Sequence, residues 1–296
     1  MVLPLVVPTF FVVLGIEIAI VALFATAFNL LMGYGGMVSF GHAAYFALGA
    51  YTAALLVKKA EVTMLLALAA APVVAGLGAL LFGVFIVRLT ATYFAMLSLA
   101  CGQIVYTIIF KWTSLTGGDN GLLNVWPSEL FKTPIVYYYF TVAVVGLSLL
   151  ALYGIVTSPF GYALRAVREN PRRASFVGVN VRRHQLMAFV LSGVFSGLAG
   201  GLFAFFNGSV FPDFGRFDKS FEPLVVALLG GVHSFFGPLA GAVGFKILET
   251  VIARQWPVYW PLALGTVLIA VIVLLPGGFV GLVEGRGWRT RPSRSK

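Results

Sequence analysis

The sequence has 296 residues, of which 60% are hydrophobic and only 10% are charged. A soluble domain needs a hydrated shell and carries charge on roughly a quarter of its residues, so this composition excludes one and indicates a helical bundle in lipid. The net charge is +10, but eleven of the twenty basic residues lie in two short segments, 158–185 and 281–296, beside apolar runs. Such segments mark the cytoplasmic side of a membrane and contact anionic lipid, and they do not indicate nucleic-acid binding.

Long apolar runs follow one another along the chain, each near the roughly 20 residues that cross a bilayer as a helix. Their expected bounds are Thr9–Met32, Phe40–Val57, Thr63–Val87, Thr92–Phe110, Ile135–Val156, Leu186–Phe206, Pro223–Ile252 and Pro257–Leu275. The run 223–252 is interrupted by glycines and counts as one span or two. We therefore predict an all-α, polytopic transmembrane helical bundle of about eight or nine spans. Residues 1–280 form its single domain, and residues 281–296 form a basic cytoplasmic tail.

The side of the membrane on which each loop lies follows from its basic residues. If the arginine-rich loop 158–185 is cytoplasmic, the loop 111–133, whose charges cancel, is external, and the uncharged N-terminus is also outside. Lys58 and Lys59 then lie on the external side, contrary to the rule that basic residues concentrate on the cytoplasmic side. Because the run before them is short and rich in glycine, it is either a full span or a broken, re-entrant helix.

Two glycine-rich interruptions resemble each other: GGMVSFG at residues 35–41 and GGVHSFFG at residues 230–237. Each precedes an apolar helix rich in small residues, as expected of a transporter built from an internal repeat whose broken helices line the substrate path. The alternative is that the glycines only allow helices to approach closely. The candidate path residues are Gly35, Gly36, Ser39, His42, Gly230, Gly231 and Ser234.

The arginine-rich loop is predicted to form two short helices. Ser158-Pro159 and Asn170-Pro171 are each typical of a helix cap followed by proline at the first helical position. Gly178 is expected to end the second helix in the left-handed conformation. Two capped helices of this length suit a groove on a partner protein. An interfacial helix resting on anionic lipid is the alternative, although such helices are usually longer and more regularly amphipathic.

Three stretches carry a family resemblance. They are NLLMGYGGMVSFGHAAYF at residues 29–46, SLTGGDNGL at 114–122 and SPFGYALRAVRENP at 158–171. In this order they resemble the LivM-type permeases of branched-chain amino acid ABC importers, over about residues 29–278. The sequence before residue 29 departs from that family, which leaves the side of the N-terminus and the number of spans open.

The resemblance implies a permease subunit that forms the path for leucine, isoleucine and valine across a bacterial or archaeal cytoplasmic (inner) membrane. Its implied partners are a second, related permease subunit, two ATP-binding-cassette ATPase subunits that hydrolyse ATP, and an external substrate-binding protein. The sequence contains no GxxxxGK[ST] phosphate loop, so we expect no cofactor in this chain. The candidate residues of the implied ATPase-coupling loop are Ser158, Phe160, Arg165, Arg168, Glu169, Asn170, Arg172 and Arg173.

Polar residues inside the apolar runs are few. Glu17 is either a functional carboxylate or a residue packed against protein, and Lys246 and Glu249, three apart on a helix, are expected to pair and tether helices. No nucleophile lies beside a base and no metal-ligand cluster occurs, so we expect neither an enzyme nor a metal site. Two alternatives stay open: a related permease for urea or another small amide, and an ion-coupled secondary transporter, which needs several polar groups that converge within the membrane.

Overall fold

The computed structural model describes residues 9–255 except residue 90, together with residues 259, 262–263, 265–266, 269 and 278–283. Apart from these isolated positions, the expected span Pro257–Leu275 and the basic tail 281–296 lie outside the described residues.

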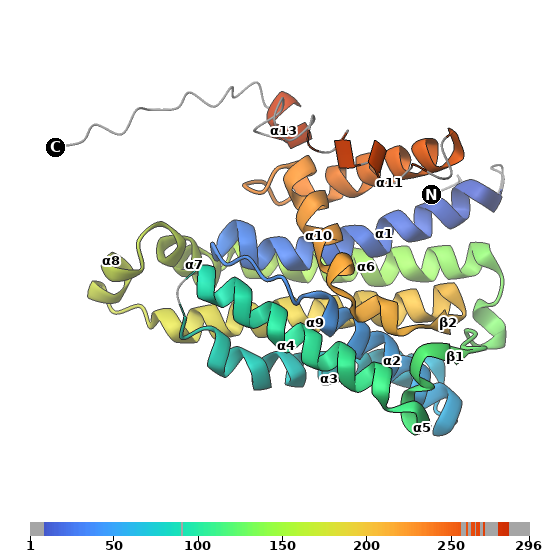
Figure 1. The fold of residues 1–296 in the computed structure, drawn as a ribbon. Helices are drawn as coiled ribbons and strands as arrows, with labels where there is room; N and C mark the ends of the chain where they lie inside the picture. Colours follow the sequence, from blue (N-terminus) through green and yellow to red (C-terminus); the bar gives the residue numbers. More distant parts are fainter. Residues whose placement is uncertain are drawn as a thin grey trace.

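Five of the described helices are long and apolar enough to cross a membrane. They are α1 (Thr9–Asn29) with its π-helical continuation η2 (Leu30–Tyr34), α3 (Met64–Ile86), α4 (Ala91–Lys111), α6 (Pro134–Thr157) and α9 (Val181–Asn207). They cross the molecule side by side (Figure 1). Large apolar side chains such as Leu81, Met96 and Leu147 are exposed on their outer surfaces, as expected where helices face lipid. The prediction of an all-α, multi-pass membrane protein is therefore confirmed.

Three shorter helices join the bundle: α2 (Ala43–Lys59), α10 (Phe217–Gly230) and α11 (Gly237–Gln255). The expected split of the run 223–252 is confirmed, because α10 ends before α11 begins. The expected start of that run was wrong, since α10 begins at Phe217, ahead of Pro223. α2 and α10 contain 17 and 14 residues, too few to cross about 30 Å of hydrocarbon at a rise of 1.5 Å per residue.

Most of the remaining elements lie at the two ends of the bundle (Figure 1). At one end, α7 (Pro159–Glu169) and α8 (Pro171–Phe176) project away from the long helices. The other end carries α5 (Thr113–Thr116), η3 (Gly118–Asn120), β1 (Leu122–Leu123), η4 (Glu129–Phe131) and β2 (Ser209–Val210). η5 (Pro212–Gly215) packs farther inside, against α2 and α4. β1 and β2 pair antiparallel with Leu122 opposite Val210. A short helix, α13 (Gly278–Val283), contacts α10 and α11.

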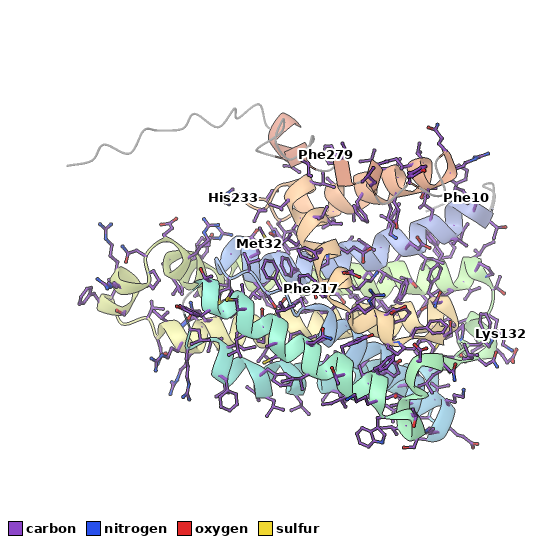
Figure 2. The ribbon with its side chains drawn as sticks, in the orientation of Figure 1. Phe10, Met32, Lys132, Phe217, His233 and Phe279 are labelled. Atoms are coloured by element: carbon purple, nitrogen blue, oxygen red, sulfur yellow. The ribbon has the colours of Figure 1, made fainter. Side chains whose placement is uncertain are left out.

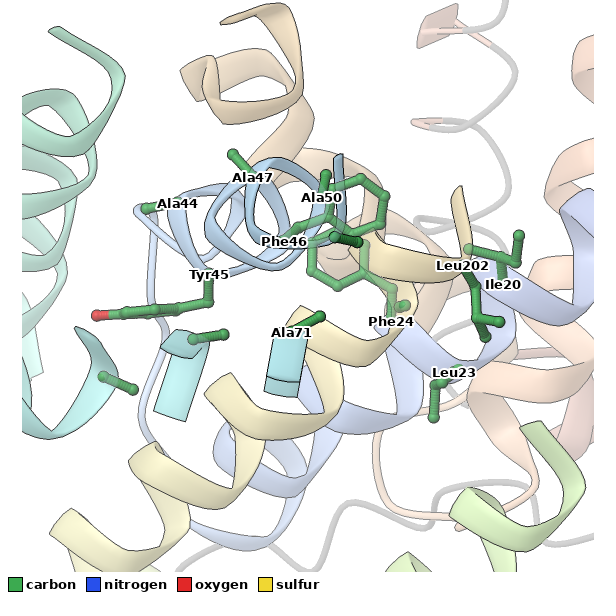
Figure 3. Packing of buried hydrophobic residues seen from close by; sticks show 14 of the residues in the cluster. Ile20, Leu23, Phe24, Ala44, Tyr45, Phe46, Ala47, Ala50, Ala71 and Leu202 are labelled. Carbon is green, nitrogen blue, oxygen red and sulfur yellow. The ribbon is translucent and has the colours of Figure 1, made fainter. Parts of the chain in front are cut away.

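The core lies where α2, α3 and α9 meet against α1 (Figure 3). Gly49 of α2 lies against the backbone of Gly197 on α9, with which a Cβ on Gly49 would collide, and a Cβ on Gly197 would collide with Ala75 of α3. Small residues therefore allow these helices to approach closely, as is usual between helices in lipid. Aromatic rings fill the space beside them, with the centroids of Phe24 and Phe46 4.9 Å apart.

The charged loops divide between the two ends as their sequence positions predict. His233 lies toward the end that carries α7 and α8, whereas Lys132 lies at the opposite end (Figure 2). Lys58 and Lys59 donate hydrogen bonds to the carbonyls of Leu123 and Ser114, so they belong to the Lys132 end. The arginines of 158–185 predict that the end with α7 and α8, called the cytoplasmic end below, faces the cytoplasm and that the two lysines face outside.

Candidate functional site

The interruption before α2 crosses the inside of the bundle as non-helical backbone. Residues 35–42 form no helix, and the donors that a helix would satisfy find hydroxyl groups instead. Phe40 N donates to Ser98 Oγ of α4, and Ala43 N donates to Ser220 Oγ of α10, each at 3.0 Å. Such backbone is tolerated within a membrane only where protein or water satisfies it. The structure thus favours a broken helix over a full α-helical span in this run.

Ser39 and His42, two of the candidate path residues, are completely buried in this subunit. Ser192 Oγ donates its proton to the carbonyl of Ala27 at 2.5 Å and lies 2.9 Å from His42 Nε2. The imidazole must therefore carry its proton on Nε2 and donate it to Ser192 Oγ. His42 Nδ1 and the hydroxyl of Ser39 have no hydrogen-bond partner in this subunit. These contacts tie α1, α2 and α9 together.

The two glycine-rich interruptions meet at the cytoplasmic end. Asn29 Nδ2 donates to the carbonyl of Ser234 at 3.4 Å, and a side chain on Gly33 would collide with the carbonyl of Val232. Within the second motif, a Cβ on Gly230 would strike the carbonyl of Gly237, and a Cβ on Gly237 would strike that of Gly231. The sequence indicated only that these two motifs resemble each other, and the structure places them in direct contact.

Arg168 of α7 joins both motifs. Its Nη1 donates to the carbonyl of Gly33, which lies in the π-helical turn η2, and lies 3.3 Å from His233 Nδ1. Gly36 makes room for this side chain: its φ is +68°, and a Cβ there would lie 2.7 Å from Arg168 Cγ. His42 and His233, which the sequence placed in corresponding positions, therefore have different environments, one in the core and one at the cytoplasmic end.

The pKa of His233 lies below its ordinary value of 6.5, first because partial burial disfavours the imidazolium and second because the Arg168 charge repels it. The neutral ring is the form whose Nδ1 accepts a hydrogen bond from Arg168. The two residues therefore interact best when His233 is uncharged.

The two predicted short helices form with the predicted caps. Ser158 Oγ accepts from the backbone N–H of Gly161, and Asn170 Oδ1 accepts from that of Arg173. Gly178 follows α8 with φ +89°, the left-handed conformation expected of it. Phe160 stacks on His184 at the start of α9, with ring centroids 5.5 Å apart.

The coupling candidates divide into an inward and an outward group. Arg165 and Arg168 face the bundle; the Arg165 guanidinium lies 4.9 Å from the ring centroid of Tyr34 and donates to the carbonyl of Val156. The outward group is exposed and consists of Glu169, Arg172 and Arg173. Sequence reasoning missed the two most exposed apolar side chains of this loop, Phe176 at 88% and Val177 at 80%. Their signal was an apolar pair at the end of a basic helix.

Five ionised side chains gather between α1, α10 and α11. Lys246 Nζ lies 3.5 Å from Glu17, 3.9 Å from Glu222 and 2.8 Å from Glu249. Lys219 Nζ lies 2.5 Å from Glu222. The expected pairing of Lys246 with Glu249 is confirmed, and Glu17 belongs to the same network. Two lysines against three glutamates leave one net negative charge.

Sequence reasoning missed Lys219 and Glu222 because it assigned them to a loop. Their spacing, K-x-x-E, repeats the spacing of Lys246 and Glu249 and was the available signal. The side chains of Glu17 and Glu249 remain 32% and 28% exposed in the isolated subunit. Charged groups within a membrane pair with one another and face protein or water-filled space in preference to lipid. We therefore expect the surface of α1 and α11 that carries them to face protein or water.

Residues 11–275 match the family described as "Branched-chain amino acid transport system / permease component". The LivM permease protein of the high-affinity branched-chain amino acid transport system of Escherichia coli K12 is 28% identical over 283 residues, which cover 86% of this chain and 66% of LivM. The LivH permease protein of the same kind of system in Salmonella typhimurium is 28% identical, with 89% of this chain and 92% of LivH covered.

A third relative is the guanosine ABC transporter permease protein NupQ of Bacillus subtilis, 26% identical over 152 residues that cover 50% of this chain and 47% of NupQ. The chain thus spans just under two thirds of the length of the LivM relatives that it matches. No solved structure matches it.

Proposed function

The chain belongs to the family of permease components of branched-chain amino acid transport systems, and from this premise we propose that it forms part of the path by which an ATP-driven importer carries leucine, isoleucine and valine into the cell. It acts in the bacterial or archaeal cytoplasmic membrane beside a second, related permease subunit. An external binding protein delivers the substrate, and two ATPase subunits on the cytoplasmic side hydrolyse ATP.

The observation that carries this proposal is the contact of Arg168 with Gly33 and His233. The outward side of α7 and α8, with Phe176 and Val177 at its tip, is the surface that the ATPase subunits grip. Because the Arg168 guanidinium contacts both segments, a movement of α7 displaces the end of α1 and the turn between α10 and α11. The docking surface and the broken-helix region are therefore mechanically joined within this chain.

The ionised network supports the position of the path. The exposed carboxylates of Glu17 and Glu249 require a polar neighbour within the membrane. The second permease subunit and the water-filled path between the two subunits supply that neighbour. The negative charge that remains in the network attracts the ammonium group of an amino acid, which suits a zwitterionic substrate.

The test is ATP-dependent uptake of radiolabelled leucine into proteoliposomes that contain this chain, its partner permease, the ATPase subunits and the binding protein. Uptake should require ATP and every component, and unlabelled isoleucine and valine should compete while urea and guanosine should not. If urea or guanosine competes and isoleucine and valine do not, the chain carries another substrate and the proposed specificity is wrong. Uptake by this chain without ATPase subunits, abolished when an ion gradient is dissipated, would overturn it.

A further inference from the structure

A cavity of about 490 Å³ opens at the cytoplasmic end. It lies between the non-helical segment after η2, the turn that joins α3 to α4, and the helices α7 and α9. Three arginines from three different elements line it: Arg88 from the turn, Arg168 from α7 and Arg182 from the first turn of α9. Gln185, one helical turn after Arg182, adds an amide. Segments that are far apart in the sequence thus bring three positive charges to one recess.

The charge of this cavity is not neutralised within the described part of the chain. None of the residues that line it is acidic, and none of the ion pairs among the described residues involves Arg88, Arg168 or Arg182. Arg88 and Arg182 are exposed. Guanidinium groups present planar forks of donors that match the oxygens of phosphate, so an anion with several oxygens is the complementary ligand.

Apolar side chains line the cavity together with the arginines. Met37, Val87 and Phe94 are buried, and Leu89, which also lines the cavity, is 41% exposed. A ligand in this position meets both guanidinium groups and apolar side chains, which suits the headgroup and first acyl carbons of a lipid better than a free ion.

The cavity includes Arg168 of α7 and Pro171 of α8, but the exposed tip of the proposed ATPase surface, Phe176 and Val177, does not line it. The turn between α3 and α4, which supplies Arg88, belongs to helices with exposed apolar side chains. Basic recesses between transmembrane helices on the cytoplasmic side are places where anionic headgroups bind.

We propose that the cavity formed by Arg88, Arg168 and Arg182 binds the phosphate group of an anionic phospholipid of the cytoplasmic leaflet. The bound phosphate lies against Arg168, the residue that joins α7 to both glycine-rich motifs. The lipid therefore stabilises the arrangement of the coupling helices against the bundle.

The test is thermal unfolding of the detergent-purified transporter complex, titrated with phosphatidylglycerol, with phosphatidylcholine and, separately, with sodium phosphate. The test variant carries Arg88→Gln and Arg182→Gln; the control carries Arg183→Gln and Arg254→Gln, which remove the same charge from exposed positions outside the cavity. Phosphatidylglycerol should raise the melting temperature, and phosphatidylcholine should not. The concentration required should rise about twenty-five-fold in the test variant, from about fivefold for each arginine, and stay within about twofold in the control.

Equal weakening in the test and control variants would overturn the site, because it would indicate attraction to net charge alone. An equal effect of sodium phosphate at the same concentration would replace the lipid by a free phosphate ion and would also overturn the proposal. If the double variant does not fold, the single variants Arg88→Gln and Arg182→Gln decide the question. Each should weaken the phosphatidylglycerol effect about fivefold while its melting temperature in phosphatidylcholine stays that of the parent protein.

Discussion

Nη1 of Arg168 lies 3.3 Å from Nδ1 of His233, although 65 residues separate the two in the sequence. The same nitrogen also donates to the carbonyl of Gly33. One side chain of a short cytoplasmic helix therefore holds the end of α1 and the turn between α10 and α11. In the proposed permease, this side chain connects a docking helix directly to the interrupted spans.

Arg168→Lys should reduce ATP-driven leucine uptake about tenfold or more, because a charge-assisted hydrogen bond contributes about 1.5–3 kcal/mol and a lysine ammonium does not reproduce the planar fork. ATP hydrolysis by the complex should continue, so that the ratio of leucine imported to ATP hydrolysed falls. Arg183→Lys, at an exposed position on the next long helix, is the control. An unchanged ratio in Arg168→Lys would remove this residue from the coupling mechanism.

The contact with His233 should make the complex less stable in mild acid. Because the pKa of His233 is lowered from 6.5, the folded protein binds this proton less readily than the unfolded chain. The stabilisation is therefore complete above pH 6.5 and is lost as the pH falls through the lower, folded pKa. The melting temperature should fall between pH 7.5 and pH 5.5, and His233→Gln, which keeps an acceptor without a titrating ring, should flatten that part of the profile. A profile identical to that of the parent protein would exclude His233 as its source.

Gly36→Ala adds a single methyl group but should impair transport strongly. The added Cβ would lie 2.7 Å from Arg168 Cγ, and the backbone φ of +68° disfavours any residue with a side chain. We expect a loss of about 1–3 kcal/mol in stability, with uptake falling in parallel with that of Arg168→Lys. Gly146→Ala in α6, where a Cβ meets nothing within 4 Å, is the matched control and should keep normal uptake and melting temperature.

Lys246→Met should destabilise the bundle by about 3 kcal/mol or more, because it leaves Glu17 and Glu249 without a cation, while Glu222 keeps Lys219. Adding Glu249→Gln should restore part of that loss, since it removes one of the unpaired charges. Lys132→Met breaks an ion pair whose side chains are 52% and 85% exposed, and it should leave the melting temperature unchanged. Thermal unfolding in detergent measures all three, and equal effects of the two lysine variants would contradict a buried network.

Much of the fold is predictable because the local sequence is enough to identify a membrane helix. Runs of about 20 apolar residues leave few alternatives, and the caps at Ser158 and Asn170 depend only on the two or three residues that follow them. The pairing of Lys246 with Glu249 needs no more than helical spacing. These features were correct because no distant part of the chain is required to specify them.

The contents of the candidate site were harder to predict because they depend on distant contacts. The inward direction of Arg168 requires the missing side chain of Gly36 and the free carbonyl of Gly33, neither of which is visible in the pattern of residues 158–171. Lys219 and Glu222 were assigned to a loop because Pro223 was taken as the start of the span, yet proline is accommodated inside α10. Ser39 and His42 were predicted beside a path, and only three-dimensional packing places them in the core of the subunit.

The hydrogen bond from Ala43 N to Ser220 Oγ spans 177 residues of sequence, and this separation bears on how the protein is made. Membrane proteins are inserted from the N-terminus as synthesis proceeds, so residues 35–42 leave the ribosome well before Ser220 exists. Until α10 arrives, the first amide of α2 lacks its native acceptor in a solvent that offers none. We therefore expect the start of α2 to reach its native packing only after α10 has been synthesised and inserted.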